Sequence, residues 1–196
     1  MKNILVVGAG GIGSWLADQL YVLESHEQLI NVSITFADDD TVDNTNLTYQ
    51  NFELDDVLDY KTESIAARYG FEGMTERIDT QSSLDNYDCV VSAVDNTKFR
   101  KLLFNWANTN PDKHWIDLRS EGNSIAAFTK NPNNTLEKML STLGEEEVED
   151  GSCQRSWELE NNVIQNGNKI VAAIGAQYIL NYVRNTISPP QMILTF

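Results

Sequence analysis

A glycine motif near the start of the chain limits the fold more than any other feature of the sequence. The apolar run Ile4–Val7 leads directly into Gly8-Ala9-Gly10-Gly11-Ile12-Gly13, which matches the pattern Gly-x-Gly-x-x-Gly. Apolar residues then recur at helical spacing, at Ile12, Leu16, Leu20 and Leu23. This order predicts a buried strand, a tight glycine turn and a helix, an arrangement that binds nucleotides in α/β proteins.

Each glycine of this motif has a distinct expected role. Gly8 allows the sharp turn, Gly10 the close approach of a phosphate, and Gly13 close packing of the helix on the strand. Together with Gly11 these residues are predicted to bind the nucleotide, because the free N–H groups of a helix N-terminus attract an anion. The alternative is a glycine turn that serves packing alone. The strand and helix around the motif favour nucleotide binding but do not identify the nucleotide.

Length and composition exclude several classes of protein. A chain of 196 residues with 41% apolar residues is expected to form a single domain, residues 1–196. The net charge of −15 argues against nucleic acids and anionic membranes as partners. Only Cys89 and Cys153 are present, so a four-cysteine zinc site cannot form and no zinc is expected. Neither a signal peptide nor a membrane-spanning segment is recognisable, which predicts a cytoplasmic protein.

Alternating patterns of strand and helix predict the fold class. Strands are expected at 30–36, 76–79, 89–94, 115–118, 125–128 and 191–196, and helices at 12–23, 61–69, 97–106, 135–143 and 169–184. The pattern predicts an α/β fold with a Rossmann-like, mostly parallel sheet flanked by helices, to which the C-terminal half adds antiparallel strands. An acidic, mobile loop is predicted at about 144–155.

Acidic residues follow two of the predicted strands. Asp38 ends the second strand, where a carboxylate can accept hydrogen bonds from ribose hydroxyls, although Asp39 and Asp40 are alternatives. Asp95 follows the strand at 89–94, and the simpler interpretation makes it the cap of the next helix. Ligands of such sheets bind beyond the carboxyl ends of the strands, which is where these acids are predicted to lie.

A longer series of residues resembles one family. The segment Asp38–Gln50 is similar to the Asp-x-Asp-x-Val and Ser/Thr-Asn-Leu-x-Arg-Gln motifs of the ThiF/MoeB/HesA family, bacterial relatives of the ubiquitin-activating enzymes. Lys61 matches the family's helix-initial lysine, and Asp95 its aspartate after the fourth strand. The turn Arg119–Asn123 resembles an Arg-x-Glu-Gly turn of the family. The ordered series is far more specific than the glycine motif alone.

The resemblance implies adenylation of the C-terminal carboxylate of a small ubiquitin-like protein or peptide, with ATP and Mg²⁺. It implies that Asp38 holds the ribose, that Lys61 neutralises the triphosphate and that Asp95 holds magnesium. It also implies that the nucleotide and its reacting phosphate are lined by Asp40, Asn46 and Gln50. Such chemistry needs positioning and positive charge, since the attacking carboxylate is already ionised. Taken singly, Lys61 could equally be a surface lysine that begins a helix.

Tyr49 departs from the family pattern, because it stands where the motif has an arginine that contacts the triphosphate. Tyrosine supplies no fixed charge, so either another cation replaces the arginine or the ATP chemistry is weakened. Arg100, Arg119 and Arg155 are the candidate replacements. Zinc cysteines of many relatives are also missing, and the pattern Gly151-Ser152-Cys153-Gln154 resembles the short zinc-less ThiF-like proteins of plasmids and phages.

Cys153 has two interpretations of equal weight. Relatives that form thioesters or persulfides use a cysteine on a mobile loop, and Arg155 would favour the Cys153 thiolate while the preceding acids oppose it. The alternative is an ordinary thiol at the edge of the core. Cys89 lies in a predicted buried strand and is assigned to the core.

Three hypotheses therefore follow from the sequence. The leading one is a ThiF-type adenylyltransferase, with a homodimer expected because relatives usually dimerise. The second is a catalytically weak or inactive module of the same fold that binds a nucleotide or recruits a partner. The third, an NAD-dependent dehydrogenase, explains the glycine motif and Asp38 but not Asn46–Gln50, Lys61 or Asp95.

Overall fold

The computed structural model describes residues 1–132, 136–143, 161 and 165–196 of the chain. Its centre is a seven-stranded sheet with the strand order β3-β2-β1-β4-β5-β6-β7. The strands are β1 (Lys2–Val7), β2 (Val32–Ala37), β3 (Glu72–Met74), β4 (Cys89–Ser92), β5 (His114–Glu121), β6 (Ser124–Thr129) and β7 (Gln191–Thr195). The first five strands of this order, from β3 through β2, β1 and β4 to β5, are parallel. The pairs β5–β6 and β6–β7 are antiparallel. The predicted mixed sheet is therefore confirmed.

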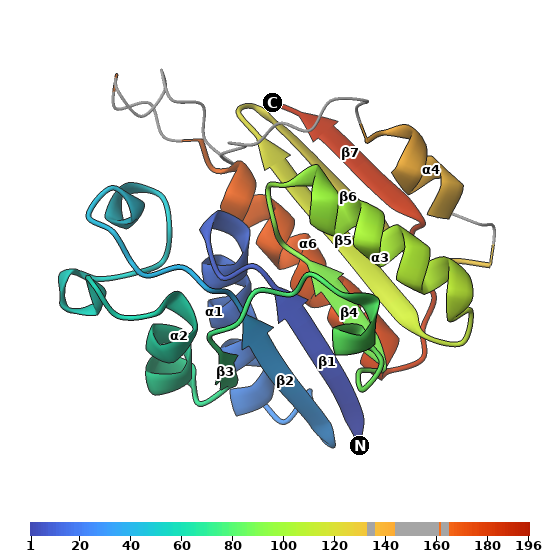
Figure 1. The fold of residues 1–196 in the computed structure, drawn as a ribbon, viewed down its shortest axis with the longest axis horizontal. Helices are drawn as coiled ribbons and strands as arrows, with labels where there is room; N and C mark the ends of the chain where they lie inside the picture. The colour runs from blue at the N-terminus through green and yellow to red at the C-terminus, as the bar shows by residue number, and fades with distance from the viewer. Residues whose placement is uncertain (133–135, 144–160, 162–164) are drawn as a thin grey trace.

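Helices cover both faces of this sheet. They are α1 (Gly11–Ser25), α2 (Lys61–Tyr69), α3 (Thr97–Thr109), α4 (Leu136–Ser141) and α6 (Gly167–Val183), with single 3-10 turns η1 (Asn46–Thr48), η2 (Leu54–Asp56) and η3 (Gln81–Leu84). Figure 1 shows α3 in front of the sheet and α6 behind it. None of the helices within the described residues has the length and apolar character needed to cross a membrane.

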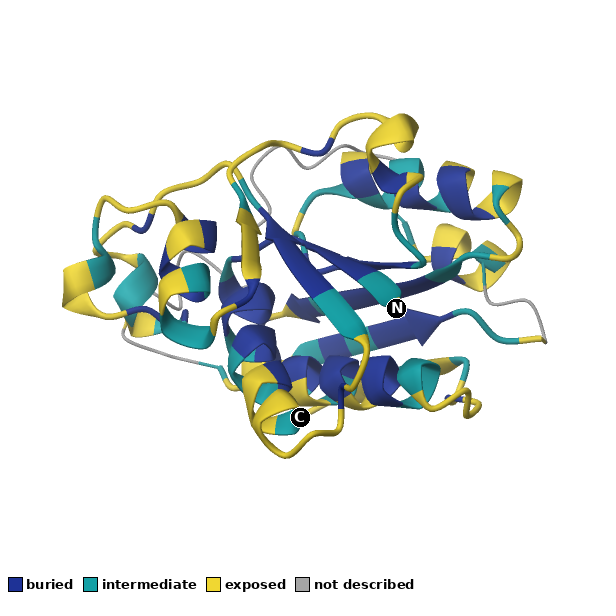
Figure 2. Ribbon diagram, turned by 90° about the horizontal axis from the view of Figure 1, so that it is seen from below, coloured by how far each residue is buried: buried dark blue, intermediate teal, exposed yellow. Residues whose placement is uncertain are grey.

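Side chains of β1 explain why its sequence is uniformly apolar. Ile4 and Val6 pack into one core with α1, α2 and α6, whereas Leu5 and Val7 pack into a second core with α3 and α4. The backbone of a strand sends successive side chains to opposite faces, so a strand covered on both faces needs no polar position. The buried strands accordingly form the middle layer in Figure 2.

The carboxyl ends of β1, β2 and β4 lie side by side. Beyond the strands, the Gly8 N–H donates to the Ala37 carbonyl at 2.9 Å, and the Ala93 N–H donates to the Val7 carbonyl at 2.8 Å. The sheet order changes direction here, since the chain goes from β1 to β2 on one side and later returns to β4 on the other. Such a switch point is where open α/β sheets bind ligands.

One predicted strand is wrong. Residues 76–79 form no strand, and the third strand is instead β3 (Glu72–Met74), beside the end of β2. Gly73 explains this pairing, because a Cβ there would lie only 2.8 Å from the Thr62 carbonyl oxygen of α2. Glycine thus lets α2 pack closely on a strand whose sequence lacks an apolar alternation. The consequence is that residues 76–79 follow a strand end and face the switch point.

Candidate functional site

The glycine turn after β1 is fixed by steric contacts at two of its glycines. Gly8 has φ +97°, and a Cβ there would lie 2.7 Å from the Ala93 carbonyl oxygen. A Cβ on Gly13 would lie 2.0 Å from the Gly8 carbonyl oxygen, so α1 packs directly on the turn. Both glycines therefore have the conformational and packing roles that the motif predicts.

Gly10 differs, because the protein itself leaves room for a side chain at this position. A Cβ there would meet only the side-chain amide of Gln50, at 3.8 and 3.9 Å. Gly10 is also the N-cap of α1, and no side chain caps that end of the helix. The N–H groups of the first turn of α1 are thus left for a ligand, and a phosphate that approaches the backbone needs the space a Cβ would take.

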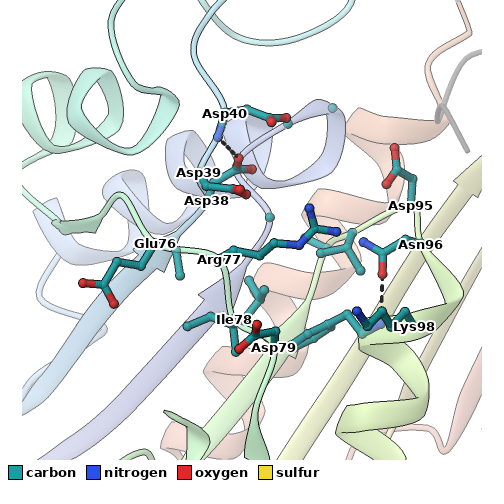
Figure 3. A pocket seen from close by; sticks show the side chains of 18 of the residues that line it. Asp38, Asp39, Asp40, Glu76, Arg77, Ile78, Asp79, Asp95, Asn96 and Lys98 are labelled. Atoms are coloured by element: carbon teal, nitrogen blue, oxygen red, sulfur yellow. Dashed lines mark hydrogen bonds between the residues drawn. The ribbon is translucent and has the colours of Figure 1, made fainter. Parts of the chain in front are cut away.

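A cavity of about 430 Å³ lies above this turn, at the carboxyl ends of β1, β2 and β4. Residues from five places line it: the glycine turn, the acidic segment after β2, Tyr49 and Gln50, residues 76–79, and the start of α3. Figure 3 shows Asp38 and Asp39 on one side of this cavity and Asp95 and Asn96 on the other. Its volume lies in the range of small-molecule sites, about 300–1,000 Å³.

Asp38 is the acid of its segment that the backbone holds in place. Its Oδ2 accepts a hydrogen bond from the Ala9 N–H at 2.6 Å, and its Oδ1 accepts one from the Asp40 N–H at 2.9 Å. Desolvation raises the pKa of this carboxyl, and the positive charge of Lys61 opposes the rise. Among the three neighbouring acids, Asp38 is therefore the one joined to the glycine turn, and it ends β2, where a ribose acceptor is expected.

Lys61 and Asp40 form an ion pair beside the cavity. The Lys61 ammonium lies 2.8 Å from the Asp40 carboxylate, and the lysine side chain is 8% exposed against 67% for the aspartate. The Lys61 N–H also donates to the Asp40 carbonyl at 3.0 Å, which joins the start of α2 to the acidic segment. Asp40 lines the cavity, whereas Lys61 is absent from its lining. A nucleotide phosphate would therefore compete with Asp40 for the ammonium.

The segment around Tyr49 is tied to α1. Trp15 Nε1 donates to the Tyr49 carbonyl at 3.1 Å, and the Asn51 N–H donates to Ser14 Oγ at 3.0 Å. Tyr49 and Gln50 both line the cavity, and Gln50 is buried, with no hydrogen-bond partner for its Oε1 in the described part of the chain. A buried, unpaired amide oxygen costs free energy and fits a ligand that donates a hydrogen bond to it.

Asn46 is held within its own turn and does not line the cavity. Its Oδ1 accepts a hydrogen bond from the Asp43 N–H at 3.0 Å, and the residue is absent from the lining of the cavity. It organises the turn that leads into η1. The structure therefore brings Asp38, Asp40 and Gln50 together but leaves Asn46 outside the site.

Asp95 is not the helix cap that the simpler interpretation suggested. Asn96 caps α3 instead, because its Oδ1 accepts a hydrogen bond from the Phe99 N–H at 2.9 Å (Figure 3). The carboxylate of Asp95 is left at the edge of the cavity. Desolvation raises the pKa of Asp95, whereas the charges of Arg100 and Lys61 lower it. A carboxylate at this place offers the oxygen ligand that Mg²⁺ prefers.

Arg77 and Lys98 are cavity residues that the sequence analysis missed. Arg77 lies in the segment 76–79 and Lys98 near the start of α3, and both line the cavity. Figure 3 shows the Arg77 side chain reaching between Asp38 on one side and Asp95 on the other. The strand predicted at 76–79 would have placed Arg77 inside the sheet. Because β3 instead ends at Met74, the residues that follow it line the cavity.

Two of the three predicted replacements for the family arginine are held by Asp117, and Arg100 also donates to the Val94 carbonyl at the edge of the cavity. Asp117 on β5 is fully buried between Arg100, at 3.3 Å, and Arg119, at 2.6 Å. Arg119 also donates to the Thr142 hydroxyl at 2.7 Å. Neither arginine lines the cavity. The third candidate, Arg155, lies outside the described residues.

The cysteines give no nucleophile within the described residues. Cys89 lies in β4 and is fully buried, and burial raises the pKa of its thiol. This agrees with its assignment to the core. Cys153 and the predicted acidic loop at 144–155 lie outside the described residues.

The fold and the glycine turn define a Rossmann-like, nucleotide-binding α/β protein. The chain belongs to the ThiF family, whose model matches residues 1–195. Proteins of this family use ATP. No curated protein matches the sequence significantly.

Solved structures share this fold at low sequence identity. A crystal structure of E. coli MccB with ATP has a TM-score of 0.66 and 20% identity, and the match covers all of this chain and 60% of MccB. The microcin C7 biosynthetic enzyme MccB in complex with N-formylated MccA gives a TM-score of 0.69 at 20% identity, covering 100% and 62%. PaaA gives 0.65 at 15% identity, covering 100% and 61%. The chain thus spans about three fifths of these proteins.

Proposed function

We propose that this chain is an ATP-dependent adenylyltransferase that activates the C-terminal carboxylate of a peptide or small ubiquitin-like protein. The observation that carries the proposal is one cavity lined by the glycine turn, by Asp38, which the Ala9 N–H holds in place, and by Asp95, whose carboxylate does not cap α3. Lys61 forms an ion pair with Asp40 of the same lining. The similarity in fold to MccB, solved with ATP and with MccA, supports it.

In this proposal each group has one task. Asp38 accepts hydrogen bonds from the ribose, and the glycine turn with the first N–H groups of α1 holds the phosphates. Lys61 neutralises phosphate charge, while Gln50 offers its unpaired Oε1 to the nucleotide. Asp95 would hold Mg²⁺, which when bound supplies further positive charge against the phosphates.

The proposed reaction needs no general base. An oxygen of the acceptor carboxylate attacks the α-phosphorus of ATP, the bond from that phosphorus to the bridging oxygen breaks, and pyrophosphate leaves. Because a carboxyl with a pKa of about 4 is ionised at neutral pH, no proton moves. The protein therefore contributes orientation of the two reactants and positive charge toward the phosphates.

ATP–pyrophosphate exchange tests the proposal. The chain is incubated with ATP, Mg²⁺ and labelled pyrophosphate, first with the MccA peptide and then with synthetic peptides and ubiquitin-like proteins that carry a free C-terminus. Exchange that requires an acceptor carboxylate is expected, and amidation of the same acceptor should abolish it. Purification with bound NAD, together with no ATP binding, would contradict the proposal.

Tyr49 favours a second candidate function. With a neutral phenol where the family motif has arginine, the chain could bind a nucleotide or a partner without turnover. Tight ATP binding without exchange across all these acceptors would support this binding module over the enzyme.

Four further expectations belong to the proposal. The chain is proposed to form a homodimer, to act in the cytoplasm and to resemble the zinc-less ThiF-like proteins of plasmids and phages. The Cys153 thiolate is proposed to attack the acyl carbon of the adenylate, so that a thioester forms, the bond from that carbon to the phosphate oxygen breaks and AMP leaves. Trapping of a thioester that Cys153→Ala abolishes supports that step, and full product formation by Cys153→Ala removes it.

Asp38→Asn tests the ribose contact. The wild-type protein is expected to bind ATP about 10- to 100-fold more tightly than 2′,3′-dideoxy-ATP, because hydrogen bonds to a charged group contribute about 1.5–3 kcal/mol. Asp38→Asn should bring the two affinities close together, as measured by calorimetric titration. Because both affinities are measured on the same variant, their ratio does not depend on what fraction of that variant is folded. An unchanged ratio would place the ribose elsewhere.

A further inference from the structure

We propose that Arg77 is the cation that binds the phosphate chain of the nucleotide in this protein. The proposal rests on the proposed function, since it assumes that ATP occupies the cavity. In this proposal Arg77, after β3, supplies the positive charge that the family motif places at the position of Tyr49.

Acidic groups dominate the lining of the cavity. Six carboxylates line it, from Asp38, Asp39, Asp40, Glu76, Asp79 and Asp95, against two cations, from Arg77 and Lys98. A nucleotide triphosphate adds several negative charges to this surface, which repel the carboxylates unless a cation lies between them. The Lys61 ammonium is already held by Asp40 at 2.8 Å, so a second cation is needed within the cavity.

The neighbour of Arg77 anchors the segment that carries it. Ile78 is 8% exposed and packs into the core with Leu84 and Phe99. The segment is anchored there, and Figure 3 shows the guanidinium of Arg77 within the cavity, between the side of Asp38 and the side of Asp95. The guanidinium thus lies between the predicted ribose ligand and the predicted metal ligand, where a phosphate chain that joins them would pass.

Arg77 is also available for a ligand. No ion pair or hydrogen bond joins its side chain to another residue in the described part of the chain, whereas Arg68, Arg100 and Arg119 each pair with a carboxylate. A planar guanidinium with five N–H donors matches phosphate oxygens in pairs, and it keeps its charge at every physiological pH. These properties suit a phosphate ligand.

The test compares ATP with adenosine in the wild type, Arg77→Met and Arg77→Lys. Affinities are measured by competition against a fluorescent ATP analogue, and the ATP-to-adenosine affinity ratio is the readout. Arg77→Met is expected to lower this ratio at least tenfold, whereas Arg77→Lys, which keeps the charge but not the paired N–H donors, should lower it less. Arg184→Met, an exposed arginine at the C-terminal end of α6, gives the matched loss of charge and should leave the ratio unchanged.

The outcomes separate this inference from the proposed function. Equal losses for ATP and adenosine in Arg77→Met would mean that Arg77 contacts the base or supports the fold, and would overturn the inference. An unchanged ratio would overturn it as well, as would an Arg77→Lys variant that behaves like Arg77→Met. A wild-type protein that binds no ATP would overturn the proposed function and this inference together.

Discussion

Gly13→Ala is expected to lose stability, whereas Gly10→Ala is expected to stay folded but lose affinity for ATP. Gly13→Ala should be strongly destabilised, because its Cβ would lie 2.0 Å from the Gly8 carbonyl oxygen, a backbone atom that would have to shift. Overpacking of a core typically costs about 1–3 kcal/mol, and a contact with rigid backbone should lie at or above the upper end. Gly10→Ala should fold, since its Cβ would meet only the Gln50 side chain, at 3.8 Å.

Thermal unfolding and ATP titration together check this pair. Gly10→Ala is expected to keep a transition close to that of the wild type while ATP affinity falls at least tenfold, because the methyl group occupies space that a phosphate needs. Gly13→Ala is expected to lose much of its unfolding transition in buffer without any nucleotide. If Gly10→Ala binds ATP like the wild type, Gly10 has no role in phosphate binding, and the glycine motif serves packing alone.

The fold was predictable where one local pattern determined one element. The helix α2 begins at Lys61 and ends at Tyr69 as expected, because Gly70 adopts φ +79° and ends it in the left-handed conformation. The strand β1 needed only its apolar run and the glycine turn. These signals depend only on residues adjacent in sequence, so they can be recognised without knowledge of the tertiary contacts.

The third strand was missed because its sequence carries no strand signal. Strand β3 exists because its edge pairs with β2, from Thr35 to Ala37, and because Gly73 admits α2. The partner strand β2 lies far from β3 in the sequence, and a glycine inside a strand is not itself a strand signal, so no local pattern predicts β3. Because the strand was predicted at 76–79, Arg77 was not included among the predicted site residues. A wrong strand boundary thus changes which side chains reach a binding edge, even when the fold class is right.

The sequence predicted which residues line the candidate site better than it predicted which hydrogen bonds their side chains make. Asp38, Asp95 and Gln50 line the cavity as the family motif implies, but Asn46 bonds to its own turn and Asn96 takes the role of helix cap. Asx side chains satisfy nearby backbone N–H groups wherever the local geometry allows. Which asparagine or aspartate does so depends on backbone angles that the sequence alone does not give.

Lys61→Met is expected to lower the rate of ATP–pyrophosphate exchange by about 10²–10³-fold, the usual effect of removing one preorganised charge-stabilising group. Methionine fills nearly the same buried volume, so α2 should remain folded, and Asp40, which is 67% exposed, returns to solvent at little cost. The loss should appear mainly in kcat, because phosphate charge increases toward the transition state.

Lys138→Met, on the exposed side of α4, is the matched control and should exchange at the wild-type rate. The control matters in a chain of net charge −15, where loss of any cation weakens the attraction of ATP over long distances. That general effect is screened by salt, whereas a contact made by the buried Lys61 is screened much less. A Lys61→Met defect that disappears on normalising to Lys138→Met, or at high ionic strength, would show that Lys61 only adds to the overall charge and does not act on the phosphates.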